Sequence, residues 1–270
     1  MQLKGVIMKF WQNVRTMVRQ YNAAKFLEKS VVITGTTRGL GWAMADEFAR
    51  LKWKVHGCGR DVEKLEMLQK KHAHCDFRQI DVADEAAVQA WINDIVTKDG
   101  VPKLAIANAS LIDTRKPLLE QDSAEFNKIM MVNVVGSMVF NKALLPYMIQ
   151  RPGRDGVIIN MSSSWGRQAD NGLAAYCASK FAVEGLTQTL RLDYGDKVGL
   201  FAMDPGGGIA TEMLDQCQLP ADYLATVPTA QEWAEKAVPF LLSLHRELPD
   251  GSITAPKVHP VSRSSSGPRQ

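Results

Sequence analysis

The chain has 270 residues, of which 46% are apolar and 23% charged, and this supplies enough apolar side chains for one large α/β domain. The composition excludes disorder over most of the chain. The apolar runs are shorter than the roughly 20 residues that a membrane span needs, so we expect a soluble protein. The net charge of +3 arises mainly at the N-terminus, where residues 1–29 hold six basic residues and one acidic residue. Because the basic charge lies in a terminal segment, a nucleic-acid partner is not expected.

Residues 1–29 place apolar residues at helical spacing, with the basic residues largely elsewhere, and this pattern favours a basic amphipathic helix. Three roles remain open: contact with a membrane surface, targeting to an organelle, or an extra helix packed on the domain or on a partner. The four cysteines form no C-x-x-C pair, so neither a disulfide framework nor a metal site is expected. We expect a reducing, cytoplasmic location unless the N-terminal segment directs the chain to an organelle.

From residue 30 onward, runs rich in β-branched residues alternate with helical patterns, which is typical of a parallel sheet flanked by helices. The predicted strands are 31–34, 54–58, 77–80, 104–108, 157–161, 199–203 and 252–254. The predicted helices are 40–51, 62–71, 85–97, 123–148, 174–194 and 230–244. We therefore predict a single doubly wound α/β domain over residues 30–256. Residues 212–229 form a long irregular stretch that could cover a site, and residues 257–270 are expected to be a disordered tail.

A glycine-rich segment, residues 34–41 (TGTTRGLG), follows the first predicted strand and opens a helix. Glycines at this junction let the backbone approach a pyrophosphate, whose charge the helix N-terminus stabilises. In such folds an acid after the second strand selects NAD, but here Gly59 and Arg60 occupy that position. Arg60, aided by Arg38, can pair with a 2′-phosphate, which predicts NADP(H). Asp81 is a candidate for the adenine amino group, although it or Asp84 could instead cap the next helix.

Tyr176 and Lys180 are four residues apart in a predicted helix, so both project from one face. Ser163 follows the strand predicted at 157–161, at the edge where parallel strands open onto a ligand crevice. A phenol beside an ammonium group is suited to proton transfer, because the positive charge favours the ionised phenol. The three side chains predict a chemical site next to the phosphate loop.

These motifs resemble the single-domain short-chain dehydrogenase/reductases over roughly residues 30–256. The matching segments are 34–41, Asp81-Val82, Asn108-Ala109, Val132-Asn133-Val134, Ser162-Ser163, Tyr176-Cys177-Ala178-Ser179-Lys180 and Pro205-Gly206. The resemblance implies a Rossmann-like, seven-stranded parallel sheet and hydride transfer between NADP(H) and a carbonyl or alcohol. Within the family, segments 38–41, 57–60, 161–166 (MSSSWG), 176–185 (YCASKFAVEG) and 211–214 are similar to plant-type NADPH-dependent pterin aldehyde reductases.

The resemblance also implies roles for individual residues. Tyr176 would be the general acid, Lys180 would stabilise its ionised form, Ser163 would hold the substrate oxygen, and Asn133 would hold a water that supplies protons. Trp165 could stack on the substrate, or it could be a packing residue in the core or a dimer, and Asp170 and Asp204 are weaker candidates for contact with a pterin. The implied cofactor residues are Gly35, Thr37, Arg38, Gly39, Leu40, Gly41, Arg60, Asp81, Val82, Asn108, Ala109, Tyr176, Lys180, Pro205, Gly206 and Thr211.

The sequence departs from the family pattern at two places. Residues 107–110 read Ala-Asn-Ala-Ser where the family usually has Asn-Asn-Ala-Gly, and one extra glycine lies between Pro205 and Thr211. This glycine could bulge outward or displace Thr211. Other readings of the chain are a reductase of a different carbonyl or quinone, and a nucleotide-binding scaffold without chemistry. The family resemblance further implies a homodimer or homotetramer.

Overall fold

Seven parallel strands form one sheet in the computed structural model, which describes residues 25–244 and 251–258. The strand order is β3-β2-β1-β4-β5-β6-β7, which confirms the predicted Rossmann-like, doubly wound fold. The strands are β1 Ser30–Thr34, β2 Lys54–Gly59, β3 Asp76–Gln79, β4 Leu104–Ala107, β5 Val157–Met161, β6 Gly199–Asp204 and β7 Ser252–Thr254. Chain order reverses beside β1, and ligands bind at such a switch point in open α/β sheets.

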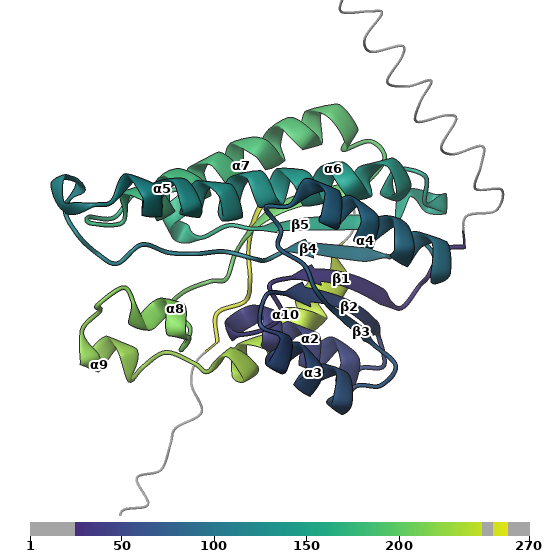
Figure 1. Ribbon diagram of the computed structural model, residues 1–270, viewed down its shortest axis with the longest axis horizontal. Helices are drawn as coiled ribbons and strands as arrows, with labels where there is room; N and C mark the ends of the chain where they lie inside the picture. Colours follow the sequence, from purple (N-terminus) through teal and green to yellow (C-terminus); the bar gives the residue numbers. More distant parts are fainter. Residues whose placement is uncertain (1–24, 245–250, 259–270) are drawn as a thin grey trace, which may run out of the picture.

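Helices cover both faces of the sheet (Figure 1). One layer holds α2 Gly39–Arg50, α3 Val62–Lys71 and α10 Ala230–Ser243, and the other holds α4 Glu85–Lys98, α5 Ser123–Met130, α6 Gly136–Met148 and α7 Ala174–Tyr194. The strands are apolar on both faces because both are covered. In β1, Val31 and Ile33 pack into the core cluster under α2 and α10, whereas Val32 packs into the cluster under α4 and α6.

The predicted helix 123–148 is continuous but not uniform. Between α5 and α6 the chain forms a π-helical turn, η2 Met131–Val135. By length and composition alone, the stretch Ser123–Met148 could cross a membrane. Its residues Phe140 and Leu144 are fully buried against the sheet, however, and core helices of globular proteins pass the same test.

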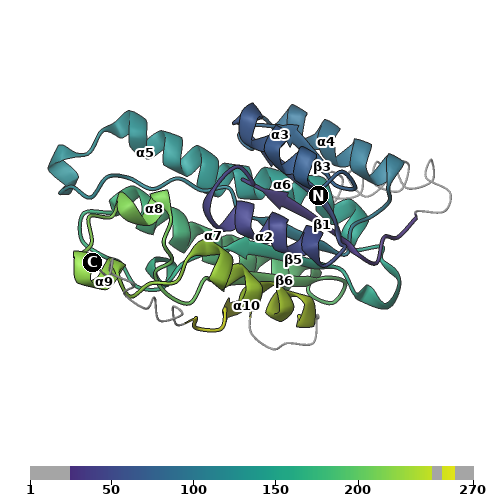
Figure 2. The ribbon, with the colours of Figure 1, turned by 90° about the horizontal axis from the view of Figure 1, so that it is seen from below.

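The predicted irregular stretch 212–229 is partly helical, which corrects the expectation of a plain loop. It contains two four-residue helices, α8 Glu212–Asp215 and α9 Ala221–Leu224. They lie at the same end of the molecule as the start of α5 and project beyond the sheet (Figures 1 and 2). Three single 3₁₀ turns, η1 Leu118–Glu120, η3 Pro152–Arg154 and η4 Ser164–Gly166, were also not predicted.

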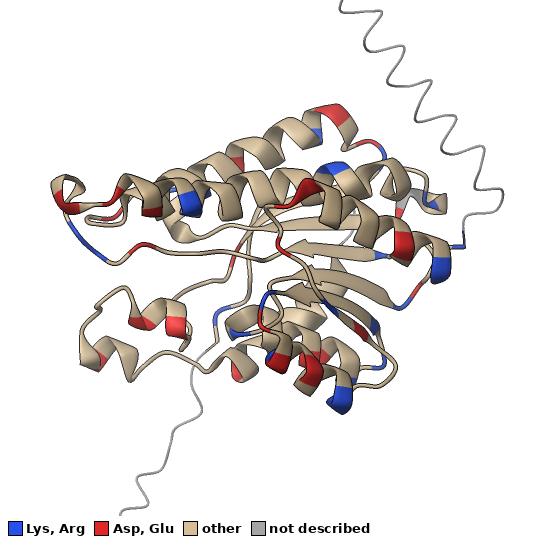
Figure 3. Ribbon diagram, in the orientation of Figure 1, with Lys and Arg blue, Asp and Glu red and all other residues tan. Residues whose placement is uncertain are grey.

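Residues 25–29, the described part of the predicted N-terminal extension, pack against the domain. Phe26 forms a parallel bridge with Val101, and the fully buried Arg151 side chain pairs with Glu28 at 3.0 Å and lies over the Phe26 ring. The rest of the predicted amphipathic segment, residues 1–24, and the predicted tail beyond residue 258 lie outside the described residues. Over the described chain, basic and acidic residues are interspersed along the helices (Figure 3).

Candidate active site

A cavity of about 610 Å³ opens at the carboxyl ends of the strands, between the phosphate loop and α8–α9. Every residue predicted to bind the cofactor lines it, apart from Gly206. Ser163, Trp165, Tyr176 and Lys180 line it as well, so residues predicted from segments far apart in the chain share one cavity. Asn133 does not reach the cavity wall.

The phosphate loop is shaped by its glycines. Gly35 adopts φ +72° and Gly39 φ +53°, a region that favours glycine. A Cβ at Gly41 would overlap the carbonyl oxygen of Gly35. No side chain caps the start of α2, and its first turn holds no acid, so its free amides suit an anion such as a pyrophosphate. The loop therefore fits the phosphates of a dinucleotide.

Asn108 holds this loop from the neighbouring strand. Its amide nitrogen donates to the carbonyl oxygens of Thr34 and Gly35, and the Asn108 and Ala109 backbone amides donate to Thr34 Oγ1 at 2.9 and 3.0 Å. The Ala-Asn-Ala-Ser sequence thus keeps the loop in place without the usual first asparagine. The hydroxyl of Ser110, where the family has glycine, is buried at the cavity and has no hydrogen-bond partner among the described residues.

Two arginines lie at the end of the cavity predicted for the 2′-phosphate. Arg60 is more than half exposed, and its nearest acid, Asp81, is 3.9 Å away. Arg38 instead pairs with Glu212 of α8 at 3.1 Å, an interaction that the sequence did not suggest. The acids have separate roles, since Asp84 caps α4 while Asp81 lines the cavity.

The segment with the extra glycine after Pro205 stays at the cavity, because Gly207 and Gly208 both line it. Gly206 packs closely against the carbonyl of Ala255, but Gly207 has open space where a side chain would be. Thr211 caps α8 and remains at the cavity wall, close to Gly39. Thr211 therefore lies at the cavity as predicted, whereas Gly206 does not line it.

Tyr176 and Lys180 lie one turn apart on α7 and are both buried. Lys180 Nζ lies 5.3 Å from the centroid of the Tyr176 ring and donates to the carbonyl oxygen of Met161. Burial lowers the pKa of Lys180 to about 7. Burial also raises the pKa of Tyr176, against a smaller opposing effect of its hydrogen bond with Ser163. The phenol therefore carries its proton at neutral pH, as a general acid must.

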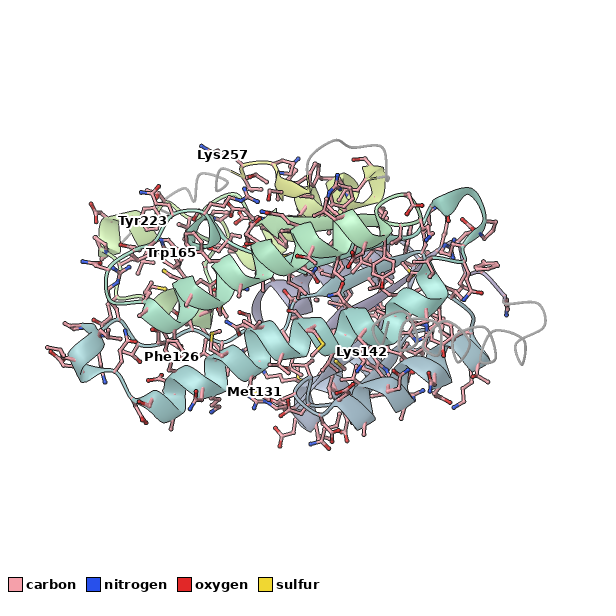
Figure 4. The ribbon with its side chains drawn as sticks, turned by 90° about the horizontal axis from the view of Figure 1, so that it is seen from above. Phe126, Met131, Lys142, Trp165, Tyr223 and Lys257 are labelled. Atoms are coloured by element: carbon pink, nitrogen blue, oxygen red, sulfur yellow. The ribbon has the colours of Figure 1, made fainter. Side chains whose placement is uncertain are left out.

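Ser163 and Trp165 complete this part of the wall. The hydroxyl oxygen of Ser163 accepts from the Trp165 amide at 3.2 Å, which fixes the turn after β5. The Trp165 ring meets the Tyr176 ring edge-on, with centroids 5.9 Å apart. Trp165 and Tyr223 of α9 lie at the same end of the molecule in Figure 4. Together with Ile112, Met213 and Cys217 they give this end of the cavity an apolar wall.

The side chain of Asn133 connects the loop after β4 to α7 through hydrogen bonds. Its side-chain oxygen accepts from the Leu111 amide at 2.7 Å, and its nitrogen donates to the Leu111 carbonyl and to Ser179 Oγ. Both amide hydrogens are used, so the side chain has no donor left for a water. The predicted water-holding role stays a prediction, and the structure instead makes Asn133 a link between three segments.

Arg115 links the segment after α8 to the loop that precedes α7, a contact that the sequence did not predict. Its guanidinium donates to the carbonyl oxygen of Cys217, just after α8, at 3.0 Å. It also donates to the carbonyl oxygen of Asn171 and pairs with Asp170 at 2.9 Å. Asp170 is engaged in this pair and does not line the cavity, whereas the mostly buried Asp204 does. Of the two acids considered for a pterin, only Asp204 is placed to meet a ligand.

A family model described as short chain dehydrogenase matches residues 29–220. The chain belongs to the short-chain dehydrogenase family. An NADPH-dependent pterin aldehyde reductase of Arabidopsis thaliana is 35% identical over 229 residues, covering 84% of this chain and 93% of the relative. A 3β-hydroxysteroid dehydrogenase 2 of Eggerthella lenta is 30% identical over 62% of this chain and 66% of the relative.

Two solved structures with a similar fold hold different cofactors. ElxO with NADP bound has a TM-score of 0.74 at 28% identity and covers 85% of this chain and 97% of its own. A 3-ketoacyl-(acyl-carrier-protein) reductase from Brucella melitensis complexed with NADH has a TM-score of 0.76 at 25% identity, covering 84% and 96%. Because similar folds are seen with NADP and with NADH, the cofactor of this oxidoreductase must be argued from residues such as Arg60.

Proposed function

We propose that this short-chain dehydrogenase is an NADPH-dependent carbonyl reductase. The convergence of Ser163, Tyr176 and Lys180 on one cavity wall carries the proposal. Arg60, which lines the same cavity, more than half exposed and paired with Asp81 only at 3.9 Å, favours the phosphorylated cofactor. The phosphate loop, Asn108 and Thr211 would hold the cofactor, which supplies the hydride when bound. The NADPH-dependent plant relative and the NADP-bound structure agree with this choice.

In the proposed reaction the residues of this chain handle the substrate oxygen. The hydroxyl of Ser163 donates a hydrogen bond to the carbonyl oxygen and holds it against Tyr176. As hydride reaches the carbonyl carbon, the Tyr176 phenol gives its proton to that oxygen, which becomes the alcohol hydroxyl. The ammonium group of Lys180 stabilises the phenolate that remains, and a proton from solvent then restores the phenol.

We further propose an aromatic aldehyde of the pterin type as substrate. The wall around Trp165 is apolar and offers a flat ring for stacking. At the cavity, Asp204 is mostly buried, and one of its oxygens accepts from the Gly206 amide. A carboxylate can accept from adjacent amino and ring N–H groups such as those of a pterin. The similarity to the plant pterin aldehyde reductase supports the same class.

The test is oxidation of NADPH by the purified protein with pterin-6-aldehyde, benzaldehyde and a quinone. We expect turnover that Tyr176→Phe lowers by at least about 100-fold without loss of NADPH binding. Tyr194→Phe, at the far end of α7, is the matched control and should keep full activity. Cofactor binding without turnover of any carbonyl would instead support a scaffold. Equal rates with pterin-6-aldehyde and benzaldehyde would contradict the pterin assignment alone.

We also propose that two copies pair through the outer faces of α6 and α7, which run side by side at the surface (Figure 4). Met138 and Phe181 are exposed there, and an apolar groove lies between the helices. A second copy would cover these side chains. Light scattering should show a dimer or tetramer that Phe181→Arg dissociates, whereas Met67→Arg on the exposed side of α3 should leave it intact. A monomeric wild-type protein would contradict this proposal.

A further inference from the structure

Asp113 is a buried acid that the proposed reaction does not use. It lies in the loop after β4, is only 2% exposed and is absent from the cavity wall. A carboxylate in such a place is costly unless hydrogen bonds satisfy it. Its two oxygens accept from the backbone amides of Ala175 and Tyr176, at 3.2 and 3.3 Å. Asp113 therefore binds the first turn of the helix that carries Tyr176.

Asp113 thus acts as the N-cap of α7 although it is far from this helix in the sequence. Leu173, at the N-cap position of α7, has no side chain that can accept, whereas Asp113 is 62 residues away in the chain from Ala175. Other helices of this fold have local caps, namely Asp61 for α3, Asp84 for α4, Asp122 for α5 and Thr229 for α10. A local cap would suffice to stabilise a helix end. A distant one also fixes where the helix end lies relative to the loop after β4.

The same loop reaches Tyr176 by a second route. The Leu111 amide donates to Asn133 Oδ1, and Asn133 Nδ2 donates to Ser179 Oγ. Ser179 Oγ in turn donates to the carbonyl oxygen of Tyr176 at 2.7 Å. Since Leu111 and Asp113 are two residues apart, these hydrogen bonds close a ring around the backbone of Tyr176. The N–H of Tyr176 is held by Asp113, and its carbonyl is held through Asn133 and Ser179.

We infer that Asp113 is a positioning residue, which together with Asn133 fixes the backbone of Tyr176 so that the phenol reaches the substrate oxygen. The inference rests on the proposed role of Tyr176 as general acid. A shift of about 1 Å in a reacting group can cost about 100-fold in rate, so a small displacement of this helix end is enough to impair proton transfer. None of the hydrogen bonds of this ring involves the phosphate loop, residues 34–41.

The test compares Asp113→Ala and Asp113→Asn with Asp84→Ala, which removes the local cap of α4. We expect Asp113→Ala to lower kcat by about 10-fold to 100-fold, with NADPH affinity and substrate KM nearly unchanged. Asp113→Asn keeps the volume and one acceptor, so it should restore part of kcat and should fold even if the alanine variant does not. Asp84→Ala should lower the melting temperature but leave kcat as in the wild type.

A second measurement is independent of turnover. Amide hydrogen exchange at residues 175–177 should be faster in the Asp113 variants than in the wild type and unchanged in Asp84→Ala. If the wild type reduces no carbonyl while exchange behaves as expected, the proposed function fails and the cap stands. Wild-type kcat in Asp113→Ala, or unchanged exchange at residues 175–177, would overturn the inference.

Discussion

Lys180 Nζ lies 5.3 Å from the centre of the Tyr176 ring and is held there by the carbonyl oxygen of Met161. Both side chains are buried, and burial shifts their pKa values in opposite directions, each towards its neutral form. The cofactor-free site therefore contains a neutral phenol beside an amine that is only partly charged near neutral pH. This arrangement has a measurable effect on stability.

The first prediction concerns how the lowered pKa of Lys180 makes the stability of the fold depend on pH. The pKa of Lys180 is about 7 in the folded chain and near 10.5 when unperturbed. Between these values the unfolded chain binds a proton that the native state lacks, so this residue makes stability rise with pH. The free energy of unfolding of the wild type and of Lys180→Met can be measured by denaturation without cofactor. The value for the wild type, relative to that of the variant, should rise from about pH 7 to about pH 10. A constant difference between the two proteins would disprove this shift.

The second prediction concerns cofactor choice. Within residues 25–244 and 251–258, the acid nearest to Arg60 is Asp81 at 3.9 Å, a longer pairing than the 3.1 Å between Arg38 and Glu212, so Arg60 can pair with a 2′-phosphate. Arg60→Ala should weaken NADPH binding by about 10-fold to 100-fold and leave NADH binding nearly unchanged, as measured by titration of nicotinamide fluorescence. Arg38→Ala should cost less, because the phosphate must first compete with Glu212 for Arg38. Equal losses for both cofactors would remove Arg60 from the phosphate site.

The third prediction compares two glycines. A methyl group at Gly41 would overlap the carbonyl of Gly35 and the side chain of Asn108, so Gly41→Ala must displace the phosphate loop. We expect NADPH affinity to fall by about 10-fold or more. At Gly185 of α7 a methyl group meets nothing within 4 Å. Gly185→Ala should keep the affinity and stabilise the fold by about 0.5 to 1 kcal/mol. Unchanged affinity in Gly41→Ala would mean that the loop does not cradle the cofactor.

The fourth prediction concerns Arg115, which joins Cys217 to Asp170 and Asn171. Removing this fork should loosen the segment after α8 that forms the apolar wall. Arg115→Ala is expected to raise KM for the carbonyl substrate by about tenfold while NADPH binding stays the same. Arg115→Lys keeps the charge but not the planar fork, so it should restore little. Full rescue by lysine would show that charge alone matters.

Much of the fold could be predicted because it depends on local patterns. Apolar runs bounded by turns gave all seven strands, and β5 and β7 have the predicted bounds. The helices α8 and α9 were missed because four residues are too few to show helical periodicity. The π-helical turn at Met131–Val135 was missed because the apolar pattern continues through it.

In the candidate site, the sequence identified residues but not the contacts between them. Tyr176 and Lys180 were predicted together because they lie one turn apart on one helix. The pairing of Arg38 with Glu212, 174 residues apart, has no local signal. The same holds for Asp113, whose partners are distant in the chain. Polar side chains in loops can be assigned partners only when the fold has brought the segments together.

The π-helical turn changes how the long helix must be aligned with other sequences. It winds one additional residue into the helix, so positions before and after it differ by about 100° from the angles that regular winding would give. Deletion of one residue within 131–135 would convert the π-helical turn into regular α-helix. Either Asn133 or all of α6 would then be rotated about the helix axis. Gaps of one residue should therefore be far rarer here among homologous chains than in the turn around Gly153, where a methyl group would meet open space.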